Sequence, residues 1–375
     1  MHIAYFSNQF ALVGEHGIAQ YARRLYEGLA DFSDLCVTPV ATWSNRDSKN
    51  LKDLQKETDL KLLPWGRKLT PIAWTFLGAP AIERWLQKPV DITHMVALGM
   101  PVITNKKLVV TVHDIGPLTH PEYFSLKPRL DKRSFEYTLR RADAIVCVSQ
   151  ATANEEIGYG VDSVSDRILL VNEGVDADFF AQEPIDPYKD FSALPHRDIP
   201  FFMAAGAMSP RKNIRRVIEA FQSVQDTIPH HLVLVGGKGW DSNEVFHMLE
   251  KTDLSKRVHH LGYVPDEHLQ ALYKYADFYI HTSLFEGFGL TVLEAMAAGC
   301  PVITSDIPSL SEVAGNSALL VDPLSVSEIA ASIRDLALNA EHKNELAKKG
   351  LQRIKAFTWK STAEGMVDVY KSVGS

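Results

Sequence analysis

Short runs of β-branched and aliphatic residues alternate with amphipathic stretches along almost the whole chain. Runs of about four to eight such residues are typical of buried strands, and the stretches between them have helical spacing. The strands predicted for the first half are residues 2–7, 35–41, 91–97, 107–114, 144–149 and 167–176. Those predicted for the second half are 200–206, 231–237, 258–264, 277–283, 300–305 and 318–321. This alternation predicts parallel sheets covered by helices.

A polar, proline-bearing stretch at 181–200 separates the two series and is the candidate linker. With 375 residues, the chain also exceeds what one hydrophobic core usually supports. The sequence therefore predicts an α/β protein with two doubly wound domains, at 1–180 and 181–357. Ligands of such sheets bind at the carboxyl ends of the strands, so two facing domains would form a cleft.

Composition indicates a folded protein, with 46% hydrophobic and 23% charged residues and no low-complexity tract. The net charge of −7 argues against a nucleic-acid partner. The cysteines Cys36, Cys147 and Cys300 are widely spaced among apolar residues, which is typical of reduced packing residues. The N-terminus lacks a signal-peptide pattern, and the apolar stretch at 72–82 is far shorter than the ~20 residues that span a bilayer. We therefore expect a cytoplasmic location.

Charge is distributed unevenly along the chain. Residues 1–150 hold 19 Lys and Arg against 15 Asp and Glu, a local charge of +4, so the remainder carries −11. A basic first half could face an anionic acceptor or a membrane surface. Ordinary solvated helix faces are the simpler explanation of the same asymmetry.

The most informative stretch is FEGFGLTVLEAMAAGCPVI, residues 285–303. It predicts a loop with two glycines after a strand, and then a helix over about 290–298. Gly287 and Gly289 let the backbone approach a ligand closely, and the first amides of the helix can hold a diphosphate.

Glu286 and Glu294 flank this helix end. A helical side chain leans toward the N-terminus, so Glu294 is expected to point back at the same ligand. A carboxylate repels phosphate but accepts hydrogen bonds from hydroxyls, so the pair predicts a sugar on either side of a diphosphate. Either glutamate alone would be an ordinary loop or helix-surface acid; the glycines and the helix favour binding.

A second motif, GAMSPRKN at 206–213, follows a strand and precedes a helix from about Ile214. Its adjacent cations, Arg211 and Lys212, are expected at the same strand-end level as the glutamate loop. There they can offset the charge that a leaving diphosphate gains. Basic residues capping a surface turn are the alternative. No Asp-x-Asp pair stands in the predicted cleft loops, so we expect neither a metal ion nor another cofactor.

Together these motifs resemble the retaining glycosyltransferases of family 4. Further segments that carry the resemblance are GEHGIAQYARRL, TVHD with IGPLTHPEYF, VCVSQAT, VNEGVD and FTWKSTAEGMVDVY, so it covers nearly the whole chain. The resemblance implies the GT-B architecture of two facing Rossmann-like domains with an interdomain cleft. The N-terminal domain would bind the acceptor, the C-terminal domain would bind the nucleotide sugar, and the last helix, 358–375, would pack back on the N-terminal domain.

The resemblance also implies roles for single residues. Arg211 and Lys212 would hold the donor diphosphate, Glu294 the ribose hydroxyls and Glu286 the transferred sugar, while His113 would face the sugar near the reaction centre. The other donor contacts expected are Gly17, Gly206, Tyr263, Val264, Gly287, Phe288, Gly289, Leu290 and Thr291. The acceptor contacts expected are His113, Asp114, His120 and Glu122. The residues expected to act in catalysis are His113, Glu286, Arg211 and Lys212.

One departure from the family pattern concerns the phosphate turn. Many relatives carry an arginine directly after its glycine, where this chain has Ala207. Arg211 is therefore expected to supply that charge.

The reaction implied is transfer of a sugar from a nucleotide diphosphate to an acceptor hydroxyl, with retention at the anomeric carbon. Same-face attack and a two-step route through Glu286 are both compatible with the sequence. The segments THPEYF and SPRKN resemble mannosyl- and rhamnosyl-type members that build bacterial surface polysaccharides, which favours a GDP-linked donor such as GDP-mannose. A GT-B nucleotide-sugar 2-epimerase and a non-catalytic nucleotide-sugar-binding scaffold are the rival functions.

The acceptor is encoded more weakly. The segment 61–76 interleaves Lys61, Arg67 and Lys68 with Trp65, Trp74 and Phe76. It could rest on lipid headgroups, at the inner face of the membrane, while a lipid-linked saccharide enters the site. Alternatively, it is an internal helix that packs its aromatic residues into the N-terminal core.

Overall fold

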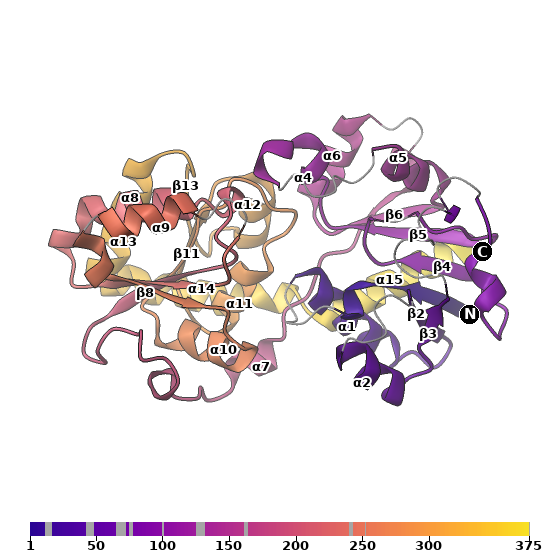
Figure 1. Cartoon of the computed structure of the whole chain (residues 1–375), viewed down its shortest axis with the longest axis horizontal. Helices are drawn as coiled ribbons and strands as arrows, with labels where there is room; N and C mark the ends of the chain where they lie inside the picture. Colours follow the sequence, from indigo (N-terminus) through magenta and orange to yellow (C-terminus); the bar gives the residue numbers. More distant parts are fainter. Residues whose placement is uncertain are drawn as a thin grey trace. The chain divides into compact units, whose positions relative to one another are not determined.

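The computed structural model describes residues 1–11, 17–42, 49–64, 73–74, 78–99, 101–124, 132–160, 164–239, 243–251 and 253–374. It divides into two compact units, both drawn in Figure 1. The first unit is formed by Met1–Thr119, Leu126–Gly174 and Trp359–Ser375. The second is formed by His120–Ser125 and Val175–Thr358.

The first unit is built on a parallel sheet with the strand order β3-β2-β1-β4-β5-β6-β7. Its strands are β1 (His2–Phe6), β2 (Cys36–Thr42), β3 (Lys61–Leu63), β4 (Ile92–Met95), β5 (Lys107–Val112), β6 (Ala144–Cys147) and β7 (Ile168–Leu170). Its helices are α1 (Ile18–Leu29), α2 (Lys49–Glu57), α4 (Gly116–Thr119), α5 (Lys132–Arg141), α6 (Gln150–Tyr159) and α15 (Trp359–Gly374).

Strand β1 shows why the strands appear in the sequence as continuous runs of apolar residues. Ile3 and Tyr5 belong to the core on one face of the sheet, and Ala4 and Phe6 belong to the core on the other. A central parallel strand is covered on both faces, so both sets of alternating side chains must be apolar.

Helix α15 brings the C-terminal end of the chain onto the first unit, where Figure 1 draws it in yellow. It packs along α1 so closely that a Cβ on Gly28 would lie 3.1 Å from the Cβ of Ala363. Its Tyr370 hydroxyl lies 2.7 Å from Nδ1 of the buried His94, whose Nε2 lies 2.8 Å from the Thr111 hydroxyl. The helix is therefore held by packing and by a buried polar chain.

The second unit is built on a parallel sheet with the order β10-β9-β8-β11-β12-β13. Its strands are β8 (Phe201–Ala205), β9 (His231–Val235), β10 (Val258–Gly262), β11 (Tyr279–His281), β12 (Val302–Ser305) and β13 (Leu319–Val321). Its helices are α7 (Ala177–Ala181), α8 (Ile214–Val224), α9 (Asn243–Lys251), α10 (Asp266–Tyr275), α11 (Leu290–Ala297), α12 (Pro308–Ala314), α13 (Val326–Leu338) and α14 (Ala340–Arg353). The prediction of two helix-covered parallel sheets is confirmed.

The stretch predicted as a linker, 181–200, packs on the second unit. Gln270 and Lys274 of α10 donate hydrogen bonds to the carbonyls of Gln182 and Ala181, at 2.8 and 3.0 Å. The polar and proline-rich composition of this stretch therefore belongs to a segment that is held against helix α10.

Within the segment 61–76, the structure describes residues 61–64 and 73–74. Residues Lys61–Leu63 form the edge strand β3, which pairs with β2. Trp74 is buried in the core and its indole N–H donates to the Pro80 carbonyl at 2.8 Å, as the core interpretation expects. Trp65, Arg67, Lys68 and Phe76 lie outside the described residues. Within the described ranges, no helix is both long enough and apolar enough to cross a bilayer.

Helix α6 carries an acidic side chain inside the first unit. Both carboxylate oxygens of Glu156 are buried, and neither has a hydrogen-bond partner in the part of the chain that the structure describes. Burial, and then the nearby Glu155, raises the pKa of Glu156 to about 7. A buried carboxylate without partners favours the protonated form because its charge is not solvated.

Replacing Glu156 with leucine should stabilise the protein, most strongly above pH 7. The pKa of Glu156 is higher in the folded than in the unfolded chain, so the wild-type free energy of unfolding should fall as pH rises from 4.5 through about 7. E156L should lack this fall and gain about 1–3 kcal/mol at pH 8. Urea denaturation between pH 4.5 and 8 measures both effects. The exposed Glu364→Leu is the control; equal pH profiles for wild type and E156L would contradict the assignment.

Candidate active site

The two predicted motifs follow neighbouring strands of the second sheet. Strands β8 and β11 are adjacent and parallel, so their carboxyl ends lie at the same edge. The 206–213 turn follows β8, and the 282–289 loop follows β11. Sheet topology therefore brings together two segments that are far apart in sequence.

Hydrogen bonds join the two segments. The Leu284 N–H donates to the Arg211 carbonyl at 2.8 Å. The side-chain amide of Asn213 donates to the carbonyls of Thr282 and Pro323, at 2.9 and 2.7 Å. Asn213 is buried and has a left-handed backbone with φ 58°, a conformation that asparagine tolerates better than most residues. It locks the cation-bearing turn, formed by η8 (Pro210–Lys212), onto the glutamate loop.

A three-residue ion-pair cluster lies at this junction. Nζ of Lys212 is 2.7 Å from Oε1 of Glu286, and the Arg211 guanidinium forms an ion pair with Oε2 of the same carboxylate. The Glu286 side chain is 12% exposed. Burial alone would raise its pKa, but Arg211 and then Lys212 hold the pKa of Glu286 well below the usual range. The structure therefore confines one negative and two positive charges in a mostly buried space.

Gly206 leaves room for the side chain of Lys212. A Cβ built on Gly206 would lie 3.1 Å from Cε of Lys212, and the backbone there has φ +133°, which favours glycine. Burial lowers the pKa of Lys212, so its charge depends on a nearby anion. In the structure that anion is Glu286.

Helix α11 begins beside this cluster, and its bounds match the predicted helix within one residue. Gly289 caps it with φ +131°, and a Cβ there would lie 2.7 Å from Cδ2 of Leu310 in α12. Glu294 is buried one turn into the helix. The first amides of α11, at Leu290 and Thr291, can face an anion, because helix N-termini carry partial positive charge.

Other expected donor contacts differ in exposure. The Phe288 side chain is buried with its ring centroid 5.9 Å from that of Phe357, so only its backbone can meet a ligand. Val264 is buried as well, whereas Tyr263 is 53% exposed. Of these two residues, both expected against the nucleotide base, Tyr263 has the accessible side chain.

In the first unit, both ring nitrogens of His113 already face acceptors. Nδ1 lies 2.7 Å from Oε1 of Glu173, and Nε2 lies 3.0 Å from the Val96 carbonyl oxygen. The His113 ring packs edge-on against Tyr21 at 4.6 Å and is 8% exposed. A sugar contact through this ring, as the resemblance implies, would require one of these bonds to be exchanged.

The remaining expected residues are divided between the two units. Asp114 accepts a hydrogen bond from the Gly116 N–H at 3.0 Å, which orients its own loop. Gly17 precedes α1 with φ 59°. His120 and Glu122 are grouped with the second unit; the His120 ring lies 5.0 Å from the Phe285 ring, and Glu122 is exposed.

Three residues at the strand ends were not singled out from the sequence. Glu173 and Asn213 lie inside motifs that were noted, but nothing in the sequence assigned them partners. His281 lies directly before the glutamate loop, and its Nε2 is 3.2 Å from Oε1 of Glu286. For His281, the one available sequence signal was that a polar residue ends a strand of buried residues.

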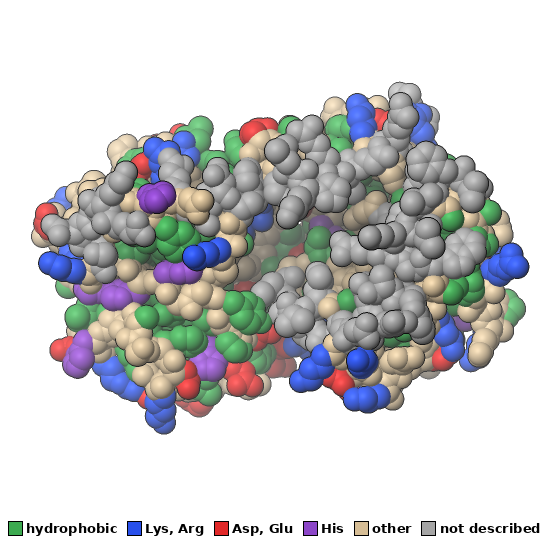
Figure 2. All heavy atoms as spheres, in the orientation of Figure 1, with side chains coloured by type: hydrophobic (Ala, Val, Ile, Leu, Met, Phe, Trp, Pro, Cys, Tyr) green, Lys and Arg blue, Asp and Glu red, His purple; other side chains and the backbone are tan. Residues whose placement is uncertain are grey.

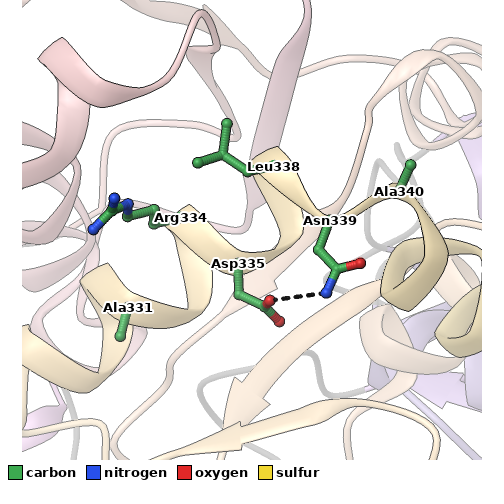
Figure 3. Close-up of a pocket in the computed structure, with 6 residues that line it drawn as sticks. All are labelled: Ala331, Arg334, Asp335, Leu338, Asn339 and Ala340. Carbon is green, nitrogen blue, oxygen red and sulfur yellow. Dashed lines mark hydrogen bonds between the residues drawn. The ribbon is translucent and has the colours of Figure 1, made fainter.

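A hollow elsewhere in the second unit shares no residue with this site. It lies where α13 meets α14 and is lined by Ala331, Arg334, Asp335, Leu338, Asn339 and Ala340 (Figure 3). The Asn339 amide donates to Asp335, and Asn339 also caps α14 by accepting from the His342 N–H. These contacts show that Asp335 and Asn339 stabilise the junction between α13 and α14. Among the described residues, no group of three or more His, Cys, Asp or Glu side chains could hold a metal ion.

Comparisons with known families agree with the two-unit organisation. Residues 16–179 match the family described as "Glycosyltransferase Family 4", and residues 189–353 match "Glycosyl transferases group 1". Together the matches cover most of both units.

Bacterial mannosyltransferases are among the similar sequences. The chain is 31% identical to the O-antigen chain mannosyltransferase B of Escherichia coli over 71% of this chain and 70% of that protein. It is also 31% identical to the O-antigen chain mannosyltransferase RfbU of Salmonella typhimurium, over 60% of this chain and 58% of that protein. Against the serotype-specific mannosyltransferase WbdA of E. coli, the chain matches only 33% of the relative's length, at 32% identity.

Solved structures share the fold over almost the full chain. Sucrose-phosphate synthase from Thermosynechococcus elongatus superposes with a TM-score of 0.78 at 22% identity, covering 99% of this chain and 98% of that one. WaaG, a glycosyltransferase involved in lipopolysaccharide biosynthesis, superposes with a TM-score of 0.71 at 17% identity, covering 98% and 99%. The fold is thus GT-B, and the chain belongs to the family 4 glycosyltransferases.

Proposed function

We propose that the protein is a retaining glycosyltransferase that moves a mannose-type sugar from a nucleotide diphosphate to a hydroxyl of a saccharide or lipid-linked saccharide. The product would be a bacterial surface polysaccharide or glycolipid. The observation that carries the proposal is the meeting of Arg211, Lys212 and Glu286 beside the N-terminus of α11. Cations and helix amides suit a diphosphate, and carboxylates suit sugar hydroxyls.

Donor binding would exchange the partners of the two cations. In the structure, Glu286 is the counter-ion of both Arg211 and Lys212. A diphosphate is a stronger anion with more acceptor oxygens, so it would take over both cations. Glu286 would then be free to accept hydrogen bonds from the transferred sugar, while Glu294 accepts them from the ribose.

The proposed chemistry is same-face substitution at the anomeric carbon. The acceptor oxygen forms a bond to that carbon as the bond to the phosphate oxygen breaks, and the acceptor's proton passes to the leaving phosphate. Arg211 and Lys212 would stabilise the charge that develops on the diphosphate, which is why we expect no metal requirement. Positioning of donor and acceptor would supply the rest of the rate enhancement.

Mannose is supported by the named sequence relatives, whereas GDP is proposed from the resemblance of THPEYF and SPRKN to mannosyl- and rhamnosyl-type members. The sequence relatives named above are mannosyltransferases, including one that this chain matches over 70% of its length. A distant structural neighbour of 17% identity, HepE from Anabaena, was solved with UDP-glucose.

Calorimetric titration of the purified protein with GDP and with UDP tests the proposal. We expect GDP to bind more tightly than UDP, and Glu294→Ala to weaken binding about 10- to 100-fold by removing charge-assisted hydrogen bonds to the ribose. Product analysis with the matching nucleotide sugar should yield an elongated saccharide with an unchanged anomeric configuration.

Each other outcome has a distinct meaning. UDP preference would overturn the GDP donor and keep the transferase. A free, epimerised sugar would indicate the epimerase, and binding without turnover on any saccharide would indicate the scaffold. Binding of neither nucleotide would refute the site.

Glu286→Gln should strengthen nucleotide binding while abolishing transfer. It removes the carboxylate that competes with the diphosphate, so affinity for the free nucleotide should rise about 5-fold, the equivalent of about 1 kcal/mol. Transfer should fall about 100-fold or more, because the sugar loses the negatively charged acceptor and one of its two acceptor oxygens. Calorimetry and steady-state kinetics measure the two effects.

The same variant should be less stable without nucleotide. Two mostly buried cations then lack a counter-ion, which costs about 2–4 kcal/mol, and bound nucleotide should restore much of that loss. Glu219→Gln is the matched control, since Glu219 pairs with Arg215 on the surface of α8 at 2.8 Å. Weaker nucleotide binding by Glu286→Gln would count against the competition.

A further inference from the structure

His281 is the buried histidine nearest to the proposed catalytic carboxylate. It is the last residue of β11 and is 4% exposed, whereas several histidines of the second unit reach the surface seen in Figure 2. Its Nε2 lies 3.2 Å from Oε1 of Glu286 and 3.2 Å from the Ser283 hydroxyl. Neither motif included it, so its role has to come from its contacts.

The contacts favour a proton on Nε2, because the Tyr279 and Thr291 hydroxyls face Nδ1, at 2.9 and 3.4 Å, while the Glu286 carboxylate faces Nε2. The Tyr279 hydroxyl lies 2.9 Å from Nδ1 of His281, closer than its 3.5 Å contact with the Ala205 carbonyl. Burial raises the pKa of the Tyr279 phenol, so the hydroxyl keeps its proton and can donate it to Nδ1. A neutral imidazole that accepts at Nδ1 must donate from Nε2. Two acceptors lie 3.2 Å from Nε2, the Glu286 carboxylate and the Ser283 hydroxyl, so the N–H can donate to Glu286.

The electrostatic surroundings keep His281 neutral. Burial, and then the neighbouring Lys212, lowers its pKa to about 4. The other charged groups around it are Arg211, which acts in the same direction, and Glu286, which opposes both. A neutral donor can orient a carboxylate without neutralising its charge.

The contact becomes more important once a donor binds. Oε1 of Glu286 is shared between His281 and Lys212, and Oε2 is held by Arg211. If a diphosphate binds Arg211 and Lys212, both cations turn from Glu286 to the phosphates. Of these three side chains around Glu286, His281 is then the one that stays with the carboxylate. Its hydrogen bond then keeps the carboxylate in place.

We propose that His281 is a positioning residue, which holds the Glu286 carboxylate toward the transferred sugar while the cations bind the diphosphate, and that Tyr279 fixes the required His281 tautomer. This inference rests on the proposed function of the same site. It predicts a separation of effects, because the residues expected to hold the nucleotide are Arg211, Lys212 and Glu294, not His281.

Kinetics of three variants test the separation. His281→Leu removes the hydrogen bond and should lower kcat about 100-fold, a typical cost of a misplaced group. His281→Gln keeps an N–H donor near the position of Nε2 and should recover at least about 10-fold of that loss. Tyr279→Phe lets the proton occupy either nitrogen and should lower kcat about 3- to 10-fold. The Kd for nucleotide, measured by calorimetry, should stay within about 3-fold of wild type in all three.

His230→Gln is the matched control. His230 is buried in the same unit and bonds a carboxylate, with Nε2 2.8 Å from Oδ2 of Asp277, but it lies near the opposite end of β11. Its replacement should leave kcat unchanged. If His281→Leu leaves kcat unchanged, as His230→Gln should, the positioning role is refuted. It is also refuted if His281→Gln recovers none of the lost kcat while the Kd for nucleotide rises in both His281 variants.

A measurement without substrate separates this inference from the proposed function. Nitrogen NMR of the protein labelled with ¹⁵N-histidine, with His281→Gln as the assignment control, reports the tautomer directly. We expect neutral His281 with its proton on Nε2 at pH 7, and a mixture of tautomers in Tyr279→Phe. A proton on Nδ1, or an imidazolium, would overturn the inference even if the enzyme is active. A wild-type protein that binds no nucleotide would refute the proposed function, while the tautomer would still decide the geometry.

Discussion

A buried carboxylate held between two cations is the constraint on which the rest of the proposed site depends. Arg211, Lys212 and Glu286 cannot be desolvated singly, because an unpaired charge in such a space costs several kcal/mol. Glycine at 206 makes room for the lysine chain, and Asn213 holds the turn that presents both cations. Glu286 thus serves as the internal counter-ion that holds both cations in position.

The parallel sheet supplies the geometry for this cluster. Because β8 and β11 are neighbours with the same direction, the turn after one and the loop after the other meet at a single edge. The start of α11 lies at that edge too, positioned by the close contact between Gly289 and Leu310. Charge, hydrogen-bond donors and a helix terminus therefore converge on one place, although they come from segments about 75 residues apart.

Much of the fold could be predicted because its signals are local. Twelve strands were expected, and each corresponds to a strand of the structure, since covered parallel strands are apolar on both faces. Strand β3 was missed because Lys61–Leu63 is short, lies at an edge and sits in a segment with aromatic and basic residues. The stretch at 181–200 looked like a linker because composition reports the lack of regular structure, not the contacts with α10.

The sequence by itself determined the two-sheet α/β class, the helix after the glycine pair and the chemical types gathered in the two motifs, because hydrophobic period, glycine positions and motif spacing are local properties of the chain. Only the tertiary structure decided which groups meet. The pairing of Glu286 with both cations and the contacts of both His113 nitrogens with Glu173 and Val96 cross between different strand ends. The approach of His281 to Glu286 depends on how the loop after β11 folds back toward its own strand. Such contacts follow from strand order and side-chain direction, which residue spacing along the chain does not specify.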